Sequence, residues 1–211
     1  MKSSAKDIFK EKFNDLDHSL LIAKESNFQW LAIAVINEHT TKLIGSDLIS
    51  SVDYTDGSDT VRVSSKQSDK FRPAFNLKLR QLRTLLQTGI IVINNKEGKL
   101  KITNPISITN SKVELIKQLG KDKFTSIVKN AKANGFEWIA TGIMSSSNRS
   151  YILTGNLPTK GETINFHSYL DSRDCFVSTT GKLAKEDIEC LLNVGICPTE
   201  AGNVIINFHK L

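Results

Sequence analysis

The chain has little cysteine, no long apolar run and no apolar core behind its basic N-terminus. Its three cysteines, Cys175, Cys190 and Cys197, are an odd number, which argues against a disulfide framework and favours reduced thiols. The longest apolar run, Leu31 to Ile36, is too short to span a bilayer. The N-terminus does not resemble a secretory signal. We therefore expect an intracellular, cytoplasmic protein with no membrane partner.

The chain also lacks the common catalytic and metal-binding motifs. It has no phosphate-binding glycine loop, no nucleophile elbow and no paired histidines on one helical face. His167, Asp171 and Asp174 imitate a general base with its orienting acids, but such a histidine is more often structural. Cys190 and Cys197 do not have zinc-finger spacing. We expect a protein that is not an enzyme, without metal, cofactor or small-molecule substrate.

Composition and charge indicate a folded protein with an anionic partner. Of the 211 residues, 39% are hydrophobic and 24% charged, as in globular proteins of one large or two small domains. The net charge is +6 and the sequence pI about 9.2. Between positions 62 and 83 the only acid is Asp69. The basic residues of this segment are Arg62, Lys66, Lys70, Arg72, Lys78, Arg80 and Arg83. A basic segment of this kind is typical of nucleic-acid binding, although a solvated helix face explains it equally well.

The second half of the chain repeats the first. "NFQWLAIAVI" from Asn27 matches "GFEWIATGIM" from Gly135, 108 residues later. Further on, "LRTLLQTGI" matches "IECLLNVGI" at an offset of 106, and the apolar residues after Gly98 match those after Gly202 at 104. Several matches in the same order indicate a tandem duplication. We predict a first repeat at 1–104, a linker at 105–110 around Pro105, and a second repeat at 111–211.

Apolar periodicity predicts one order of elements for both repeats: a helix, three strands, a helix and two strands. Phe9 to Ala23 carries apolar residues at spacings of three and four, which predicts one amphipathic helix, and Ser111 begins a capping-box pattern in the second repeat. The apolar run at Trp30 predicts a central buried strand, and its tryptophan is expected in the core. "TKLIGSDLI" and "DTVRVSS" predict the next two strands, as do "SYILTGNL" and "DCFVSTT" in the second repeat.

The end of each repeat is predicted with the same logic. A second helix is expected at 76–88 and at 185–193, and each ends at a glycine, Gly89 or Gly195, that can adopt left-handed geometry. Two-stranded ribbons then turn at "NNKEGK" and "TEAGN". The predicted fold is therefore α+β, with two tandem copies of a curved antiparallel sheet packed against two helices.

This arrangement resembles a known DNA-binding family. "NGF" after the first helix, the helix ending in Gly195-Ile196, and the strand after Gly202 are similar to the C-terminal double-wing domain of the MotA family, the middle-promoter transcription activators of T-even-type bacteriophages. The first repeat carries the resemblance at 82–90 and 98–102. The resemblance implies a curved sheet whose wings lie on DNA. The winged-helix half of that family, which engages the host sigma factor, has no counterpart here.

Two groups of residues are candidates for DNA contact. In the predicted second helix, Arg80 and Arg83 share a face that Asn76 and Gln87 extend, and such a face contacts phosphates or base edges. Arg62, Lys66, Lys70 and Arg72 lie on the strand and loop that lead into this helix, and Lys78 lies within it. The wing group is Lys96, Lys99 and Lys101. A hairpin of this size fits a DNA groove.

The second repeat differs in charge, which leaves two functions open. Acids predominate between Asp171 and Glu189, so the second repeat is expected to have another task, for example contact with a host protein. The first hypothesis is a non-enzymatic, phage-type protein that binds double-stranded DNA in transcription regulation or host takeover and associates with the bacterial nucleoid. The alternative is a module that binds a host or viral protein, inhibits or redirects it, and has no direct role on DNA.

Overall fold

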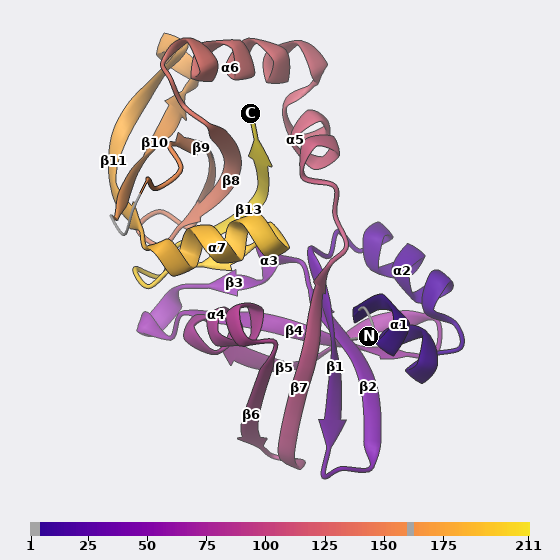
Figure 1. Cartoon of the computed structure of the whole chain (residues 1–211). Coiled ribbons are helices and arrows are strands. Elements are labelled where there is room, and N and C mark those ends of the chain that lie inside the picture. The colour runs from indigo at the N-terminus through magenta and orange to yellow at the C-terminus, as the bar shows by residue number, and fades with distance from the viewer. Residues whose placement is uncertain (1–4, 160–162) are drawn as a thin grey trace. The chain divides into compact units, whose positions relative to one another are not determined.

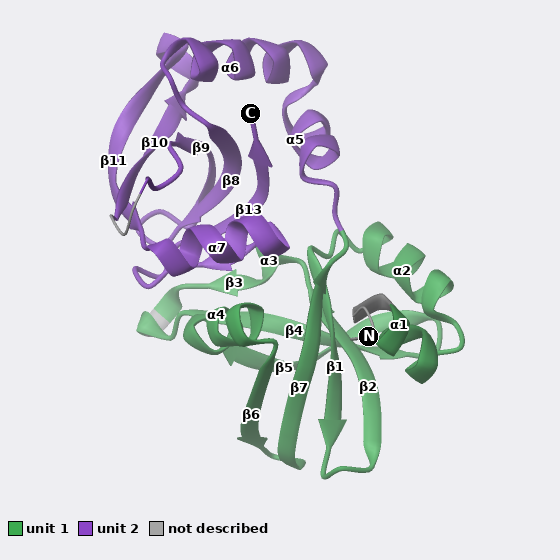
Figure 2. Cartoon of the chain, viewed as in Figure 1, with its two compact units in different colours: residues 1–108 green, residues 109–211 purple. Residues whose placement is uncertain are grey.

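The computed structural model describes residues 5–159 and 163–211 and divides into two compact units, residues 1–108 and 109–211 (Figures 1 and 2). Each unit combines helices with one curled sheet whose neighbouring strands are all antiparallel, which confirms the predicted α+β class. Among the described residues, no helix has the length and apolarity needed to cross a membrane.

Unit 1 begins with two helices, has a short helix after its second strand, and has a fourth helix that packs on the other face of its sheet (Figure 1). The strand order is β5-β4-β2-β1-β7-β6, and β3 also pairs with β4. Its elements are α1 (Ala5–Lys12), α2 (Leu16–Glu25), β1 (Trp30–Ile36), β2 (Thr40–Ser46), α3 (Leu48–Ser51), β3 (Val52–Asp53), β4 (Thr60–Gln67), β5 (Lys70–Lys78), α4 (Leu79–Thr88), β6 (Ile90–Asn95) and β7 (Gly98–Ser107).

Unit 2 has the same sheet topology. Its strand order is β11-β10-β9-β8-β13-β12, so each strand occupies the place of a unit 1 strand. Its elements are α5 (Ser111–Leu119), α6 (Lys121–Ala133), β8 (Trp138–Met144), β9 (Arg149–Gly155), β10 (Ile164–Leu170), β11 (Cys175–Leu183), α7 (Lys185–Val194), β12 (Cys197–Pro198) and β13 (Val204–Lys210). Equal strand order in two consecutive units is the arrangement that a duplicated sequence produces.

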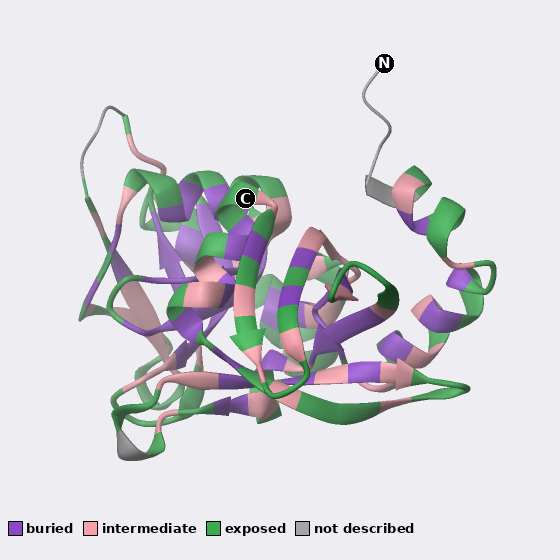
Figure 3. Cartoon of the chain, turned by 90° about the horizontal axis from the view of Figure 1, so that it is seen from below, coloured by how far each residue is buried: buried purple, intermediate pink, exposed green. Residues whose placement is uncertain are grey.

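The central strand of each sheet is buried because helices cover both of its faces. In unit 1, Leu31 and Ile33 pack against apolar residues of α1 and α2, including Phe9 and Ala23. The leucines of α4, Leu79, Leu82 and Leu86, are buried against the opposite face of the sheet. Trp30 and its counterpart Trp138 are fully buried, as the apolar strand pattern predicts, and buried residues occupy the inward sides of the elements in Figure 3.

Hydrogen bonds at the start of the central strand are the same in both units. The Gln29 side chain accepts a bond from the Leu48 amide at 2.5 Å, and the Glu137 side chain accepts one from the Leu157 amide at 2.6 Å. The carbonyl of Gln29 accepts a bond from Ile108, and that of Glu137 from Leu211, at 3.2 Å and 2.9 Å. Each contact ties the last residues of a unit, or the turn after its second strand, to the central strand.

Matching positions also share unusual backbone geometry. The helices α4 and α7 both end at a glycine in left-handed conformation, Gly89 with φ 79° and Gly195 with φ 77°, where glycine has no steric cost. Asn104 and Asn207 both have φ 54°, at irregularities in the last strand of each unit. A duplicated sequence that keeps these rare conformations keeps the same chain path.

The structure corrects the predicted strands. Each unit has four long strands between its helices, whereas the sequence predicts three. The strands that the prediction lacks are β5 and β10. "DCFVSTT" belongs to β11, the counterpart of β5, while β10 is the counterpart of β4. Strand β5 was missed because Pro73 and the alternating charges of "KFRPAFNLK" weaken the strand pattern.

The helix boundaries also differ from the prediction. The expected helix over 9–23 is two helices, because the chain turns at Asn14 and Asp15, residue types that favour turns and helix starts. Helix α4 begins at Leu79, so Asn76 lies on β5 and not on the face of Arg80. In unit 2 the capping side chain of α5 is Asn110, which accepts a hydrogen bond from Val113 at 3.2 Å.

The predicted linker overlaps the end of a strand. Strand β7 continues to Ser107, and Pro105 lies where the pairing of β7 with β1 is irregular, so its missing N–H breaks no ladder bond. The division between the units falls after Ile108. The predicted offset of 104 for the last strand is also wrong by one residue: Ile33 pairs with Thr103, whereas its counterpart Thr141 pairs with Ile206.

Candidate nucleic-acid interface

A groove of about 780 Å³ lies on the α4 side of the unit 1 sheet, beyond the part that the helix covers. Its floor contains apolar side chains of the three central strands, among them Ala34, Ile44 and Leu100. Three cationic residues line it, together with amide and hydroxyl groups. These polar and charged residues are Lys42, Ser65, Arg62, Gln67, Asn76, Asn95, Lys96 and Glu97.

The β6–β7 turn is fixed at one end of this groove. The Asn37 side chain donates a hydrogen bond to the Glu97 carbonyl at 2.9 Å and accepts one from the Lys99 amide at 3.0 Å. A Cβ at position 98 would overlap the Asn37 amide, and Gly98 has φ 118°, so only glycine permits this approach. The contact therefore holds Lys96 in place beside the groove.

The charges of the groove are only partly neutralised. Lys42 lies 3.7 Å from the carboxylate of Glu97, in an exposed pair that is worth about 0–1 kcal/mol. Hydrogen bonds from Thr55 lower the pKa of Asp53, and the charge of Arg62 lowers it further. Arg62 and Lys96 are exposed. The groove thus combines positive charge with hydrogen-bond donors.

The ten predicted contact residues do not form one surface. Arg62 and Lys96 line the groove, while Lys99 and Lys101 lie on the opposite face of the β6–β7 ribbon, opposite Asn94 and Val92. Four other cations are exposed on β5 and α4: Lys70, Arg72, Lys78 and Arg80. Arg83 is half-buried on α4.

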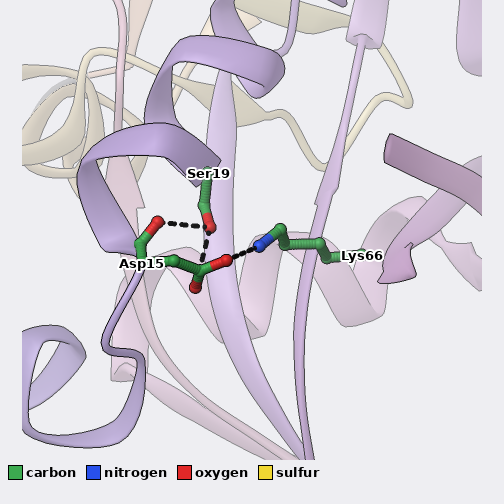
Figure 4. A network of polar contacts seen from close by, with 3 residues as sticks. All are labelled: Asp15, Ser19 and Lys66. Carbon is green, nitrogen blue, oxygen red and sulfur yellow. Dashed lines mark hydrogen bonds and ion pairs between the residues drawn. The ribbon is translucent and has the colours of Figure 1, made fainter. Parts of the chain in front are cut away.

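Lys66 is committed to a contact inside unit 1. Its ammonium group donates a hydrogen bond to the carboxylate of Asp15, at the start of α2, and its side chain is only 11% exposed (Figure 4). The Ser19 hydroxyl also donates to the Asp15 carbonyl at 3.0 Å. The bond from Lys66 lowers the pKa of Asp15. The structure therefore gives Lys66 a role in fixing α2 on the sheet, which sequence spacing did not indicate.

The acidic segment of unit 2 is largely engaged within that unit. Asp187 is buried and accepts a hydrogen bond from the Ala184 amide at 2.9 Å, which caps α7. Asp171 pairs with Lys123 at 2.8 Å, and Asp174 accepts a bond from the Tyr169 hydroxyl. Burial, followed by this bond to Asp174, raises the pKa of Tyr169 to about 12. These contacts reduce the free negative charge expected for a protein-binding surface.

The residues of the weaker candidate clusters make structural contacts within unit 2. The ring of His167 stacks on Phe136 with centroids 4.8 Å apart, and its buried Nδ1 has no hydrogen-bond partner among the described residues. Asp171 is paired with Lys123, and Asp174 accepts a hydrogen bond from Tyr169, so neither carboxylate bonds to His167. Cys190 and Cys197 are buried and reduced. A hydrogen bond with Cys190, together with burial, raises the pKa of Cys197 and keeps the thiol protonated. Within residues 5–159 and 163–211, no three potential ligands gather into a metal site.

Comparison with known proteins adds no relative: no family model matches the chain, nor does a curated protein or a solved structure. The contrast between the two units is therefore the most direct comparison. Lys42, which sequence reasoning missed, pairs with Ala34, whereas the residue that pairs with the corresponding Gly142 is Tyr151. No local pattern marks Lys42, because only the fold brings it to the groove.

Proposed function

We propose that unit 1 is a non-enzymatic binding module for double-stranded DNA and that its groove is the contact surface. The observation that carries the proposal is the uncovered end of the sheet, where Lys42, Arg62 and Lys96 surround a groove rich in hydrogen-bond donors. Exposed cations on the adjacent β5 and α4 extend the positive surface. The protein would act in the bacterial cytoplasm, in phage transcription regulation or host takeover.

The charged and the neutral residues of this surface would have different roles in DNA binding. The three cations neutralise backbone phosphates and supply affinity that does not depend on sequence. The amides of Asn76 and Asn95 are short, neutral groups that donate and accept hydrogen bonds, as base edges and phosphates require. Because Asn37 and Gly98 fix the β6–β7 turn, Lys96 meets DNA without first having to order its backbone.

The resemblance to the double-wing family supports the same proposal. Each unit has a curled sheet that ends in a two-stranded ribbon, the arrangement that the resemblance implies. Of the three groove cations, only Arg62 lies in the basic segment at 62–83, and Lys42 and Lys96 lie outside it. The proposal therefore rests on the groove and is supported, but not carried, by the resemblance.

The test is binding of the full chain to a random-sequence DNA duplex, measured by fluorescence anisotropy across salt concentrations. Three phosphate contacts give a log–log slope of about −2.7, so affinity should fall about 40-fold between 50 and 200 mM salt. The double variant R62E/K96E should reduce the slope to about −0.9 and weaken binding at least tenfold.

The matched control is K129E/K182E, which makes the same change in net charge on exposed lysines of unit 2. It should leave most of the affinity intact. Equal losses in the two double variants would show that only net charge matters, and would overturn the groove as the site. Absence of binding at low salt would overturn DNA as the ligand and favour the protein-binding alternative.

A further inference from the structure

Strand β6 ends the unit 1 sheet and leaves backbone groups available on its outer side. Among the strands that the structure describes, it pairs with β7 alone, and the two-residue turn at Lys96 and Glu97 makes Asn95 and Gly98 a hydrogen-bonded pair. Since bonded and non-bonded pairs alternate, the N–H and C=O groups of Val92 and Asn94 point away from β7. Those of Ile90 also point outward but bond to the Thr88 hydroxyl.

This edge lacks the features with which proteins protect edge strands. "IIVINN" contains no proline and no charge, and the side chains of Ile90 and Val92 are 43% and 50% exposed. The equivalent strand of unit 2, β12, has only two residues, and one of them is Pro198. The duplicated copy thus closes the edge that unit 1 keeps open, although both pair with the last strand in the same way.

The face of the β6–β7 ribbon that carries the side chains of Ile90 and Val92 is positively charged. Lys101 lies directly opposite Val92, and Lys99 opposite Asn94, so all four side chains share one face. Both lysines are exposed and have no ion pair with any residue that the structure describes. Lys12 and Lys101 line a neighbouring cleft of about 540 Å³, in which Glu38 is the one acid.

We propose that β6 binds an extended, acidic segment of another protein, which joins the sheet as an additional antiparallel strand. The outward groups of Val92 and Asn94 bond to its backbone, as in other cases of strand addition. An added strand would lie about 9.5 Å from β7, two strand spacings away. Lysine stems can cross the small side chain of Val92 over that distance and reach carboxylates at alternate positions of the segment. A second copy of this chain fits less well, because it would bring the same lysines together.

The proposal is tested with an acetylated, amidated decapeptide of alternating Glu and Val, added to the full chain and followed by NMR. We expect the amide signals of Val92 and Asn94 to shift and their hydrogen exchange to slow. K99E/K101E should weaken binding at least tenfold. V92P removes an outward N–H without breaking a β6–β7 bond and should abolish binding, whereas the control V92T should retain it.

Three results would overturn the proposal. One is equal binding of the corresponding Lys-Val decapeptide, which would remove the charge argument. Another is unchanged affinity in K99E/K101E, a variant that informs even where V92P fails to fold. The third is a dimer in sedimentation that V92P dissociates, since the occupant would then be a second copy. DNA binding through the groove should survive V92P, so failure here and failure of the proposed function are distinguishable.

Discussion

The two buried tryptophans should respond very differently to the same substitution. Trp30 and Trp138 occupy equivalent positions in the central strands, and both are fully buried. The Trp138 indole N–H donates to the Asn156 carbonyl at 3.1 Å, whereas the Trp30 indole N–H has no acceptor among the described residues. We predict that W138F destabilises its unit more than W30F destabilises the other.

The difference can be estimated because the two substitutions remove the same volume. W138F also loses one hydrogen bond, which is worth about 1 kcal/mol. W30F removes a buried donor without a partner and so relieves about 1–3 kcal/mol of desolvation. The two free energies of unfolding should therefore change by amounts that differ by about 2–4 kcal/mol.

Amide hydrogen exchange read by mass spectrometry in increasing urea measures both effects, since peptides from β1 and β8 report on separate units. The tryptophan left in each variant gives a fluorescence control on the unsubstituted unit. Equal destabilisation by W30F and W138F would refute the reasoning, because it would mean that the Trp30 indole has an acceptor in solution.

Two further predictions concern single contacts. K66M should lower the stability of unit 1 by about 0.5 kcal/mol at pH 7, while K70M, on an exposed lysine, should not. The folded pKa of Asp15 lies below its unfolded value of 3.8, because Lys66 donates a hydrogen bond to the carboxylate. The stability that the Lys66–Asp15 pair contributes is therefore present above pH 3.8 and is lost as pH falls through the folded pKa. Urea titrations of K66M and the wild type should converge in acid. G181A should destabilise unit 2 by about 1–3 kcal/mol, since its Cβ would overlap the buried Phe166 ring. The second substitution in G181A/F166L removes the overlapping ring and should recover part of that stability, as measured by thermal unfolding. A loss as large as that of G181A alone would contradict the overlap.

The sequence predicts what depends on short-range apolar periodicity. The stripe Leu79, Leu82 and Leu86 and the glycine after it define α4 without reference to the rest of the chain, and all three leucines are buried. The run at Trp30 likewise identifies a central strand. Both signals occur twice, so the duplication of the elements can be recognised before the fold is known.

Strand register is beyond this kind of reasoning, because it depends on pairing with distant segments. Gly98 and Gly202 suggested an offset of 104 for the last strand, but the pairing of Thr103 and Ile206 shows 103. In a strand, one residue of slip moves every side chain to the other face. Assigning faces from sequence therefore fails even where the repeat is correct.

The same limitation explains why the basic residues were grouped as one surface. Lys96 and Lys99 are three positions apart, yet one lines the groove and the other lies on the reverse face of the ribbon. Along β4, Lys66 alternates with the buried Val61, Val63 and Ser65, which predicts a solvated side chain, but its contact with Asp15 depends on how α2 lies on the sheet. Net charge identifies a segment, whereas function depends on the face to which the fold assigns each charge.

The differences between the copies carry the functional argument. Both units keep the backbone features that define the sheet, including the left-handed glycines after α4 and α7. Unit 1 differs where it has Lys42 in place of Tyr151 and a six-residue edge strand in place of a two-residue strand with Pro198. A shared fold cannot require residues that only one copy has. The groove and the open edge are therefore features that the shared sheet does not need in order to fold, and they are the surfaces on which we propose that unit 1 binds its partners.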